Sequence, residues 1–442
     1  MTAASHPFRY SGYRLEPDRG LLTCHYSLGD RDFAEQITFR PDGRWDTPAI
    51  GQAARLIFLL AGVSYYKTAA PPVIDLGQTA VTGTERAFLR SFYLDGLGEF
   101  AYRNDLDLSG LELVGGTAAQ PGPGQVPGEA PGRLLIPFGG GIDSIVTVEL
   151  MRGRGDAALF VMSRPGDRFT AIERPAAVTG LPVVRAGREI DPQLLRSREL
   201  GFRNGHVPVT GVLSAIAVMA GLLAGRDTVV MSNEWSASVA TLETGGRAVN
   251  HQYSKSAGFE AGFRRVLAEA FGGQVTYFSA LRPFSELWVA RKFAGLAQYH
   301  GTFRSCNRAF QVDPARRLDH WCGQCDKCCF IDLILAPFLP AAELARVFGG
   351  AEPLTDPALA GRFQALLGTS ASARPFECVG DIGECRAAAV LAAARPDRAG
   401  DTMLHTLAGQ FPAPSPATID ALLRPVGEHW IPDAYAAHDL LV

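Results

Sequence analysis

The sequence lacks an excess of positive charge. Its 42 lysines and arginines face 45 aspartates and glutamates, so the formal net charge at pH 7 is -3. A protein that binds nucleic acid needs a basic surface to neutralise phosphates, and this composition therefore argues against a nucleic acid as partner. Hydrophobic residues make up 47% of the 442 residues, which is enough for sizeable cores.

Long apolar runs are also missing. The longest apolar helix that we expect, residues 211–225, is too short to span a bilayer. The opening residues, MTAASHPFRY, show no charged segment followed by an apolar one, which a secretory signal would have. We therefore expect a cytoplasmic protein that does not have a membrane as partner.

Two common phosphate-binding motifs do not occur around residues 133–144, RLLIPFGGGIDS. No lysine precedes Ser144, as GxxxxGK[ST] requires, and the glycines do not follow GxGxxG. The segment instead reads as a buried strand, three glycines and the start of a helix. Glycines let a ligand approach the backbone closely, and the free N–H groups of a helix start bind phosphate. The alternative is a glycine-rich turn without a ligand, and the strand and helix around it favour the phosphate site.

The chain before this loop predicts an N-terminal α+β domain, residues 1–114. Polar and apolar residues alternate over residues 8–39, which indicates a β-hairpin or meander. Residues 50–66 and 84–102 have helical spacing. Residues 115–132 are more than half glycine and proline, so we expect a linker there.

After the loop, short apolar runs alternate with helical segments. We expect strands at 158–162, 183–186, 228–231 and 275–278. This alternation predicts an α/β fold with a doubly wound parallel sheet over residues 133–340, followed by a mainly helical region over 341–442. Ligands of such sheets bind at the carboxyl ends of the strands. The residues that we expect to bind a nucleotide are Gly139, Gly140, Gly141, Asp143, Ser144, Ser163 and Asn233.

Four of the eight cysteines have the spacing of a zinc site within segment 306–329. These four are Cys306, Cys322, Cys325 and Cys328. Four thiolates suit tetrahedral Zn²⁺ and leave no open position for catalysis, so we expect a structural zinc ion or its evolutionary remnant. The alternative is a set of buried core cysteines. We expect the neighbouring Cys329 to pack inward.

The loop at 133–144 resembles the SGGxDS loop of the N-type ATP pyrophosphatases, which adenylate a substrate with release of pyrophosphate. The resemblance implies the fold of that class, also called adenine nucleotide alpha hydrolase-like, and ATP as ligand. Gly139 stands where that loop has its first serine, so a hydroxyl donor must come from elsewhere. The cysteine segment is similar to the zinc-binding end of the 7-cyano-7-deazaguanine synthases, which carry the same loop.

Six motifs together resemble the UDP-N-acetylmuramoyl-L-alanyl-L-glutamate epimerase family. They are GLGEFAYRND (96–105), PFGGGIDS (137–144), SNEWSAS (232–238), VNHQYSKS (249–256), WCGQCDKCCF (321–330) and PFECVG (375–380). The resemblance implies that ATP and Mg²⁺ are used to invert the terminal L-glutamate of UDP-N-acetylmuramoyl-L-alanyl-L-glutamate for peptidoglycan biosynthesis. An acyl-adenylate would make the α-proton removable, and AMP and pyrophosphate would be released.

Several polar residues are candidates for this chemistry. We expect His251 and Lys255 to do the acid/base work, and Glu234 to bind magnesium or position the adenylate. His206 and Tyr253 are further candidates. Cofactor-independent glutamate racemases use two thiols, which draws attention to Cys378, although we interpret this residue as a buried turn cysteine. Cations that can serve the substrate pyrophosphate are Arg282, Arg291, Lys292, Arg304 and Arg308, although helical surface charge explains most of them equally well.

Two other functions remain open from the sequence. A 7-cyano-7-deazaguanine synthase-like ligase would explain the loop and the cysteines, but it leaves the N- and C-terminal regions without a role. A nucleotide-binding protein that has lost catalysis is indicated only by Gly139.

Overall fold

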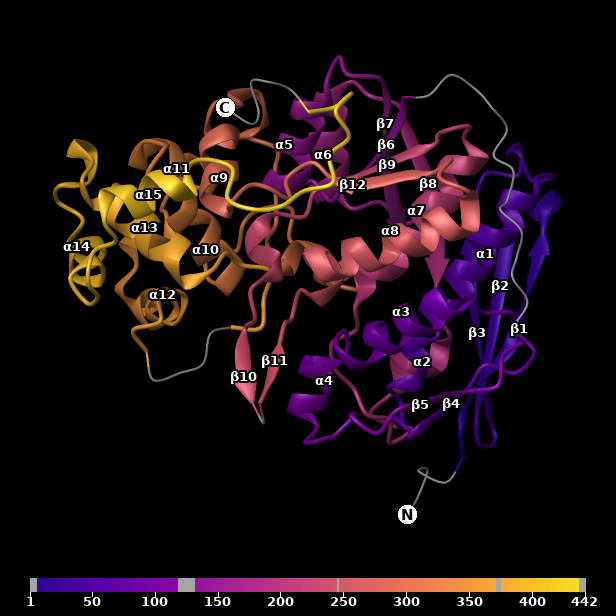
Figure 1. Cartoon of the computed structure of the whole chain (residues 1–442). Helices are drawn as coiled ribbons and strands as arrows, with labels where there is room; N and C mark the ends of the chain where they lie inside the picture. The colour runs from indigo at the N-terminus through magenta and orange to yellow at the C-terminus, as the bar shows by residue number, and fades with distance from the viewer. Residues whose placement is uncertain (1–5, 118–131, 245, 371–374, 437–442) are drawn as a thin grey trace.

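The computed structural model describes residues 6–117, 132–244, 246–370 and 375–436 (Figure 1). The strands are β1 (Phe8–Glu16), β2 (Leu21–Leu28), β3 (Arg31–Thr38), β4 (Val73–Asp75), β5 (Glu112–Val114), β6 (Arg133–Pro137), β7 (Asp156–Ser163), β8 (Val183–Glu189), β9 (Thr228–Met231), β10 (Leu242–Thr244), β11 (Arg247–Val249) and β12 (Thr276–Ser279). Only β10 and β11 lie outside the main sheet, as an antiparallel pair of their own among the described residues.

Helices connect and cover these strands. They are α1 (Pro48–Ala61), α2 (Val63–Tyr66), α3 (Gly83–Leu94), α4 (Gly98–Arg103), α5 (Ile142–Met151), α6 (Thr170–Thr179), α7 (Val209–Leu223), α8 (Ala257–Phe271), α9 (Glu286–Ala294), α10 (Asp326–Leu335), α11 (Ala341–Val347), α12 (Ala360–Leu367), α13 (Ile382–Ala393), α14 (Thr402–Ala408) and α15 (Pro416–Leu422).

The main sheet has ten strands in the order β12-β9-β6-β7-β8-β3-β2-β1-β4-β5. The strands from β12 to β8 are all parallel to their neighbours, as the alternation of strands and helices predicts. The predicted α/β class is therefore confirmed, with a large, mostly parallel sheet. Antiparallel pairing enters only where β8 meets β3 and within the meander β1–β3.

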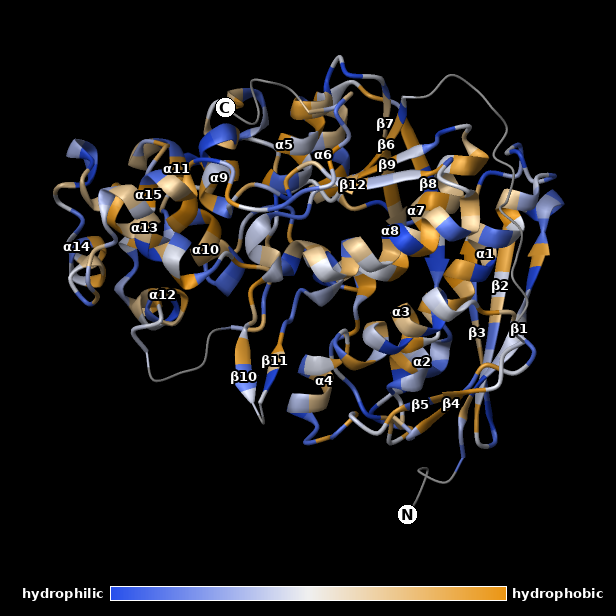
Figure 2. Cartoon of the chain, viewed as in Figure 1, coloured by the Kyte–Doolittle hydropathy of each residue, from blue (hydrophilic) through white to orange (hydrophobic). Residues whose placement is uncertain are grey.

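The central parallel strands β6, β7 and β9 are mostly buried on both faces, and this explains why they are apolar at most positions. The neighbouring strand β8 is mostly half-buried and carries two arginines and a glutamate. Leu135 packs into a core with α1, α7 and α8, whereas its neighbours Leu134 and Ile136 face a second core with α5, α6 and α9. Successive side chains of a strand point to opposite faces, so one sheet serves two cores. Figure 2 shows α1 and α7 as largely apolar helices beside the sheet.

The N-terminal meander joins the main sheet because β3 pairs with β8 from Gln36↔Glu189 to Thr38↔Gly187. The helical spacing over residues 50–66 forms α1 and α2, and the segment Pro48–Tyr66 is long and apolar enough to cross a bilayer. It lies almost wholly buried inside the protein, as a core segment does. Our expectation that residues 211–225 form the longest apolar helix was therefore wrong. The domain boundaries at 114 and 132 stay a prediction, and linker residues 118–131 lie outside the described residues.

The C-terminal region consists of helices and loops in its described residues, as predicted. Helices α10 to α15 gather at one end of the molecule, beyond α9 (orange to yellow in Figure 1). Their apolar residues extend the core that contains α5 and α9. This region also returns the segment 375–380 toward the carboxyl ends of the parallel strands.

Candidate active site

A cavity of about 450 Å³ lies at the carboxyl ends of β6 and β9. The strand order reverses between these two strands, because β7 and β8 follow β6 on one side while β9 and β12 lie on the other. Open α/β sheets bind their ligands at this point of reversal. The volume of the cavity is in the range typical of small-molecule sites. The cavity walls include residues 141–144 after β6 and residues 231–233 at the end of β9.

The three glycines after β6 differ in what surrounds them. Gly140 has φ +77°, and an added Cβ would lie 2.2 Å from the carbonyl oxygen of Ala171. A Cβ on Gly141 would lie 2.7 Å from the Ser305 hydroxyl, whereas one on Gly139 would meet nothing within 4 Å. The loop is therefore pressed against its neighbours at Gly140 and open at Gly139, and α5 begins directly after it.

Three carboxylates meet beside the loop. One oxygen each of Asp143, Glu234 and Glu286 lies within 4.8 Å of the others. Asp143 Oδ1, Glu234 Oε2 and Glu286 Oε2 are buried and have no hydrogen-bond partner among the described residues. Burial and the charge of Glu234 raise the pKa of Asp143 to about 6, and burial and Asp143 raise the pKa of Glu286 well above its usual range. A cluster of this kind can hold a hard divalent cation through oxygen ligands.

Cations line the same cavity. Lys255 stays protonated, because nearby Cys378 and Glu234 outweigh its burial and raise its pKa. The buried Arg304 donates its backbone N–H to the Gly140 carbonyl at 3.1 Å, but its Nε and Nη1 atoms have no hydrogen-bond partner. An unpaired buried guanidinium beside a glycine loop is suited to a phosphate. Lys327 also lines the cavity.

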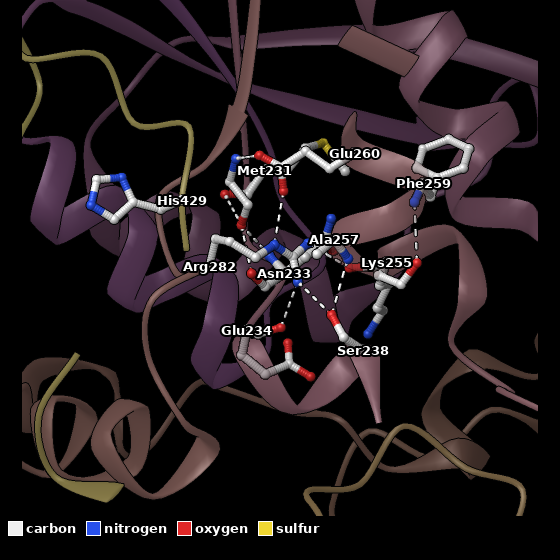
Figure 3. Close-up of polar contacts among 12 residues, drawn as sticks. Met231, Asn233, Glu234, Ser238, Lys255, Ala257, Phe259, Glu260, Arg282 and His429 are labelled. Carbon is white, nitrogen blue, oxygen red and sulfur yellow. Dashed lines mark hydrogen bonds and ion pairs between the residues drawn. The ribbon is translucent and has the colours of Figure 1, made fainter. Parts of the chain in front are cut away.

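Arg282 does not serve a ligand, contrary to one of our expectations. It lies fully buried between two loops of the site (Figure 3). Its Nε atom donates to Glu260 at 2.9 Å, and its Nη atoms donate to the backbone carbonyls of Glu234 at 2.8 Å and Lys255 at 2.6 Å. Arg282 therefore fixes the backbone at two candidate residues. Two other predicted cations are engaged elsewhere, since Arg291 bonds the Leu423 carbonyl and Lys292 lies over the Trp288 ring.

A second polar group lies behind the cavity wall. Glu99, at the start of α4, accepts from Arg103 at 2.6 Å and pairs with His251 Nδ1 at 2.5 Å. The Cys378 side chain is near enough to His251 for each group to shift the pKa of the other. His206 Nδ1 lies 4.0 Å from Glu99, and its ring centroid is 4.3 Å from that of His251. Cys378 lines the cavity, which contradicts its interpretation as a buried turn cysteine; His251 and His206 are not among the described lining residues.

Of the remaining predicted residues, some line the cavity and others do not. Asn233 lines the cavity, and its backbone N–H donates to the Ser279 hydroxyl at 2.7 Å. Ser144 also lines the cavity, although its hydroxyl donates to the Gly141 carbonyl at 3.1 Å. Ser163 donates to two backbone carbonyls at the end of β7 and is not among the described lining residues. Tyr253 packs against Phe259 in the core.

Sequence reasoning gave no role to several residues of the site. They are Glu99, Glu286, Ser305 and Lys327. Glu99 and Lys327 lie within two of the six motifs, which is a signal that could have pointed to them. Glu286 and Ser305 belong to no motif, and only the fold brings them to the cavity.

The four predicted cysteine ligands meet in space. The sulfur atoms of Cys306, Cys322, Cys325 and Cys328 all lie within 4.8 Å of one another. Cys328 Sγ is 3.7 Å from Cys322 Sγ and 3.5 Å from Cys325 Sγ. Zn–S bonds of about 2.3 Å in a tetrahedron give sulfur separations of about 3.8 Å, so the group can hold zinc. Cys329 is fully buried outside this group, as predicted.

Comparison with known families assigns the chain. The family model of the MurL N-terminal domain matches residues 1–280, and that of the MurL C-terminal domain matches residues 302–421. The chain belongs to the MurL family. The family resemblance of the six motifs is thereby confirmed.

Curated relatives of this MurL family member match along almost its whole length. A protein of Xanthomonas oryzae pv. oryzae is 37% identical over 97% of this chain and 95% of its own. Proteins of Salinispora tropica (37% identical) and a Micromonospora species (36% identical) also match 97% of this chain, and 94% and 96% of their own. All three are named UDP-N-acetyl-alpha-D-muramoyl-L-alanyl-L-glutamate epimerase. No solved structure matches the chain significantly.

Proposed function

We propose that this protein epimerises the terminal L-glutamate of UDP-N-acetylmuramoyl-L-alanyl-L-glutamate to D-glutamate, with ATP and Mg²⁺ and through an acyl-adenylate. AMP and pyrophosphate leave, and the product enters peptidoglycan biosynthesis in the cytoplasm. The observation that carries the proposal is one cavity in which a glycine loop, unpaired buried carboxylates and an unpaired buried arginine meet. The names of the three relatives supply the substrate.

The residues that line the cavity support the proposal that its ligand is a nucleoside triphosphate. The glycine loop and the first amides of α5 offer N–H donors to phosphate oxygens, and Arg304 offers a guanidinium with two free donor atoms. The Ser305 hydroxyl lies beside Gly141, so it can replace the hydroxyl that Gly139 does not provide. We take these features as support for a fold of the ATP pyrophosphatase type.

The carboxylate cluster supports magnesium. Asp143, Glu234 and Glu286 would hold the ion, because each has a buried oxygen without a partner and the three carboxylates repel one another. Magnesium usually binds through carboxylates together with substrate phosphates, where it neutralises phosphate charge. Within the chain, Lys255 and Lys327 lower the pKa of Asp143 and so keep part of this charge in place.

Adenylation explains why ATP is needed for epimerisation. A free carboxylate resists loss of the neighbouring Cα proton, because a second negative charge would develop beside the first. The acyl-adenylate removes the first charge and lets an enolate form. Lys255 lines the cavity where this proton exchange would occur, and His251 neighbours the lining residue Cys378. Buried charges there act with little screening by water.

We also propose that the four cysteines hold a structural zinc ion. The zinc site would fix the loop between Cys306 and α10. Lys327, which lines the cavity, lies in the first turn of α10. Metal analysis of the purified protein should give about one zinc per chain, and the Cys325→Ser variant should lose it. Zinc-free wild-type protein with full stability would contradict this role.

The proposed reaction has a direct test. Wild-type protein is incubated with ATP, Mg²⁺ and UDP-N-acetylmuramoyl-L-alanyl-L-glutamate in deuterated water. We expect substrate-dependent release of AMP and pyrophosphate, deuterium at Cα and D-glutamate after hydrolysis. Pyrophosphate release without deuterium at Cα would point to an adenylating ligase, and no release would point to a nucleotide-binding protein.

A further inference from the structure

Cys378 faces the cavity, whereas the histidine near it does not. Cys378 belongs to the segment 375–380 ahead of α13 and lies among the residues that line the cavity, together with Lys255 and Asp143. His251 is not among the described lining residues, but it is near enough to Cys378 for each group to shift the pKa of the other. Of the two, Cys378 is therefore the residue placed to meet a ligand in the cavity.

Neighbouring polar groups lead from Glu99 through His251 to Cys378. Glu99 is 5% exposed and binds His251 Nδ1 at 2.5 Å, while Arg103 Nε holds its other oxygen at 2.6 Å. A carboxylate that orients an imidazole, which in turn bonds a thiol, is the arrangement that activates sulfur in enzymes. The three residues come from three motifs far apart in sequence, so the fold brings them together.

The segment that carries Cys378 is held in place from several sides. Lys327 Nζ donates to the Cys378 carbonyl, and Asn307 Nδ2 donates to Glu377 Oε1 at 2.8 Å. The Phe376 ring lies 5.8 Å from that of Tyr102 and 4.9 Å from the Arg103 guanidinium. The sulfur is thus presented to the cavity by contacts to α4, α10 and the loop after Cys306.

Charges around the sulfur favour the thiolate. Burial alone would raise the pKa of Cys378, but Lys255, His251 and Lys327 lower it to about 7. Burial would lower the pKa of His251, but the nearby Cys378 and the hydrogen bond to Glu99 raise it to about 9. Burial and the neighbouring His251 lower the pKa of His206 to about 4, so His206 is neutral. A thiolate beside an imidazolium is the state expected near pH 7.5.

Independent features indicate that a ligand reaches this sulfur. Arg304 and Asp143 line the same cavity and have buried polar atoms without partners, as does Ser232. Buried polar groups are almost always hydrogen-bonded in proteins, so these atoms mark where a ligand binds.

We propose that Cys378 is the catalytic thiol that exchanges the Cα proton of the substrate glutamate, with His251 and Glu99 as positioning residues. This inference rests on the proposed function and replaces His251 as the group that meets the proton. The Cys378 thiolate takes the proton, so an S–H bond forms as the Cα–H bond breaks, and the electron pair moves into the adenylated carbonyl as an enolate. The Lys255 ammonium returns a proton to the opposite face, and exchange with water resets both groups.

The Cys378→Ser variant tests the proposal in deuterated water with ATP, Mg²⁺ and the L-glutamate substrate. The hydroxyl keeps the shape of the side chain but is a far weaker acid, so we expect deuterium incorporation at Cα to fall by about 10²–10⁴-fold. Substrate-dependent pyrophosphate release should stay within about tenfold of wild type, which also shows that the variant folds. The buried Cys24→Ala variant, altered in β2 far from the cavity, should behave as wild type in both assays.

Each outcome has a distinct meaning. If wild type releases no pyrophosphate, the proposed function fails. If wild type is active and Cys378→Ser still incorporates deuterium within tenfold of it, the thiol proposal alone is overturned. Equal loss of pyrophosphate release and deuterium incorporation in Cys378→Ser would also overturn it, because Cys378 would then act in adenylation or folding.

The positioning role of His251 has its own readout. The Cys378 sulfur faces Lys255, Lys327 and His251, and His251 in turn faces Glu99 and His206. Removal of one cation in His251→Gln should move the ascending limb of the pH profile for deuterium incorporation upward by about one unit or more. Iodoacetamide labelling of Cys378 in the full chain, mapped by mass spectrometry, should show the same shift. An unchanged limb and labelling profile would overturn the link between His251 and the thiol.

Discussion

Two buried arginines close to the cavity have opposite surroundings. Arg282 is 1% exposed and Arg304 is 6% exposed, so both have given up most of their hydration. Arg282 is compensated by Glu260 and two backbone carbonyls, whereas Nε and Nη1 of Arg304 have no partner. Most buried donors of a protein are hydrogen-bonded, so two unpaired donors on a side chain that lines a cavity point to a ligand there. The comparison separates Arg282, which stabilises the backbone of the site, from Arg304, which has donor atoms available for a ligand.

The carboxylates near the cavity can also be divided into paired and unpaired groups. Glu260 accepts from Arg282 and from the Ser279 backbone N–H at 2.9 Å, and it stabilises the loop ends (Figure 3). Asp143, Glu234 and Glu286 instead gather like charges and keep oxygens without partners. Stability is therefore supplied by the paired groups, and the unpaired groups reduce it until a ligand binds.

The largest expected effect is that of Asp143→Asn. The amide keeps the size of the side chain and removes one negative charge from the cluster, so magnesium binding weakens. We expect pyrophosphate release to fall at least about 10³-fold, while the thermal midpoint at pH 7 stays the same or rises because repulsion is relieved. Steady-state pyrophosphate assays and thermal unfolding measure the two effects. A variant with more than a tenth of wild-type activity would remove Asp143 from the site.

The two arginines can be exchanged for alanine as a matched pair. Arg282→Ala leaves Glu260 buried without its partner, so we expect the free energy of unfolding to drop by about 3–5 kcal/mol. Arg304→Ala should leave that free energy unchanged or higher, and should raise the KM for ATP about tenfold or more. Urea unfolding of both variants measures the free energy of unfolding, and pyrophosphate-release kinetics measure the KM for ATP. Equal destabilisation of the two would mean that Arg304 is a scaffold residue as well.

The unpaired residues were partly visible in the sequence, because Asp143, Glu234 and Arg304 were all expected to serve ligands. The pairing of Arg282 with Glu260 was not visible. Local patterns fixed the parallel strands, the glycine loop and the cysteine spacing, because each depends on neighbouring residues. The antiparallel contact of β3 with β8 and the arrival of Glu286 in the carboxylate cluster join positions far apart in the chain. No periodicity reports such contacts.

Two errors of interpretation have the same origin. Arg282 was expected to serve a ligand because basic residues cluster around it in sequence, yet its partners come from three other segments. Cys378 was interpreted as a buried turn cysteine, yet the fold turns it toward the cavity and brings His251 to it. In both cases we interpreted the residue from its type and from its neighbours in sequence, whereas the partners that decide its role come from distant parts of the chain.

The glycine loop allows a smaller and more local test. Gly140→Ala places a Cβ 2.2 Å from the Ala171 carbonyl at a residue with φ +77°, so the loop must shift. We expect pyrophosphate release to fall about tenfold or more. Gly139→Ser adds a side chain into open space and restores the serine of the ATP pyrophosphatase loop, so activity should stay within about threefold. The pattern fails if Gly139→Ser loses more activity than Gly140→Ala.

The smallest expected effect is a dependence of stability on pH and magnesium. An acid whose pKa is raised by folding binds its proton more tightly in the folded state, so stability declines as pH rises from the unfolded pKa to the folded one. For Asp143 this interval runs from 3.8 to about 6, and the loss is about 3 kcal/mol. Magnesium should reverse the decline above pH 6, since it binds the ionised cluster, and Asp143→Asn should flatten it. Thermal midpoints measured across pH 4–7 with and without magnesium test this directly; a magnesium effect of equal size in Asp143→Asn would place the ion elsewhere.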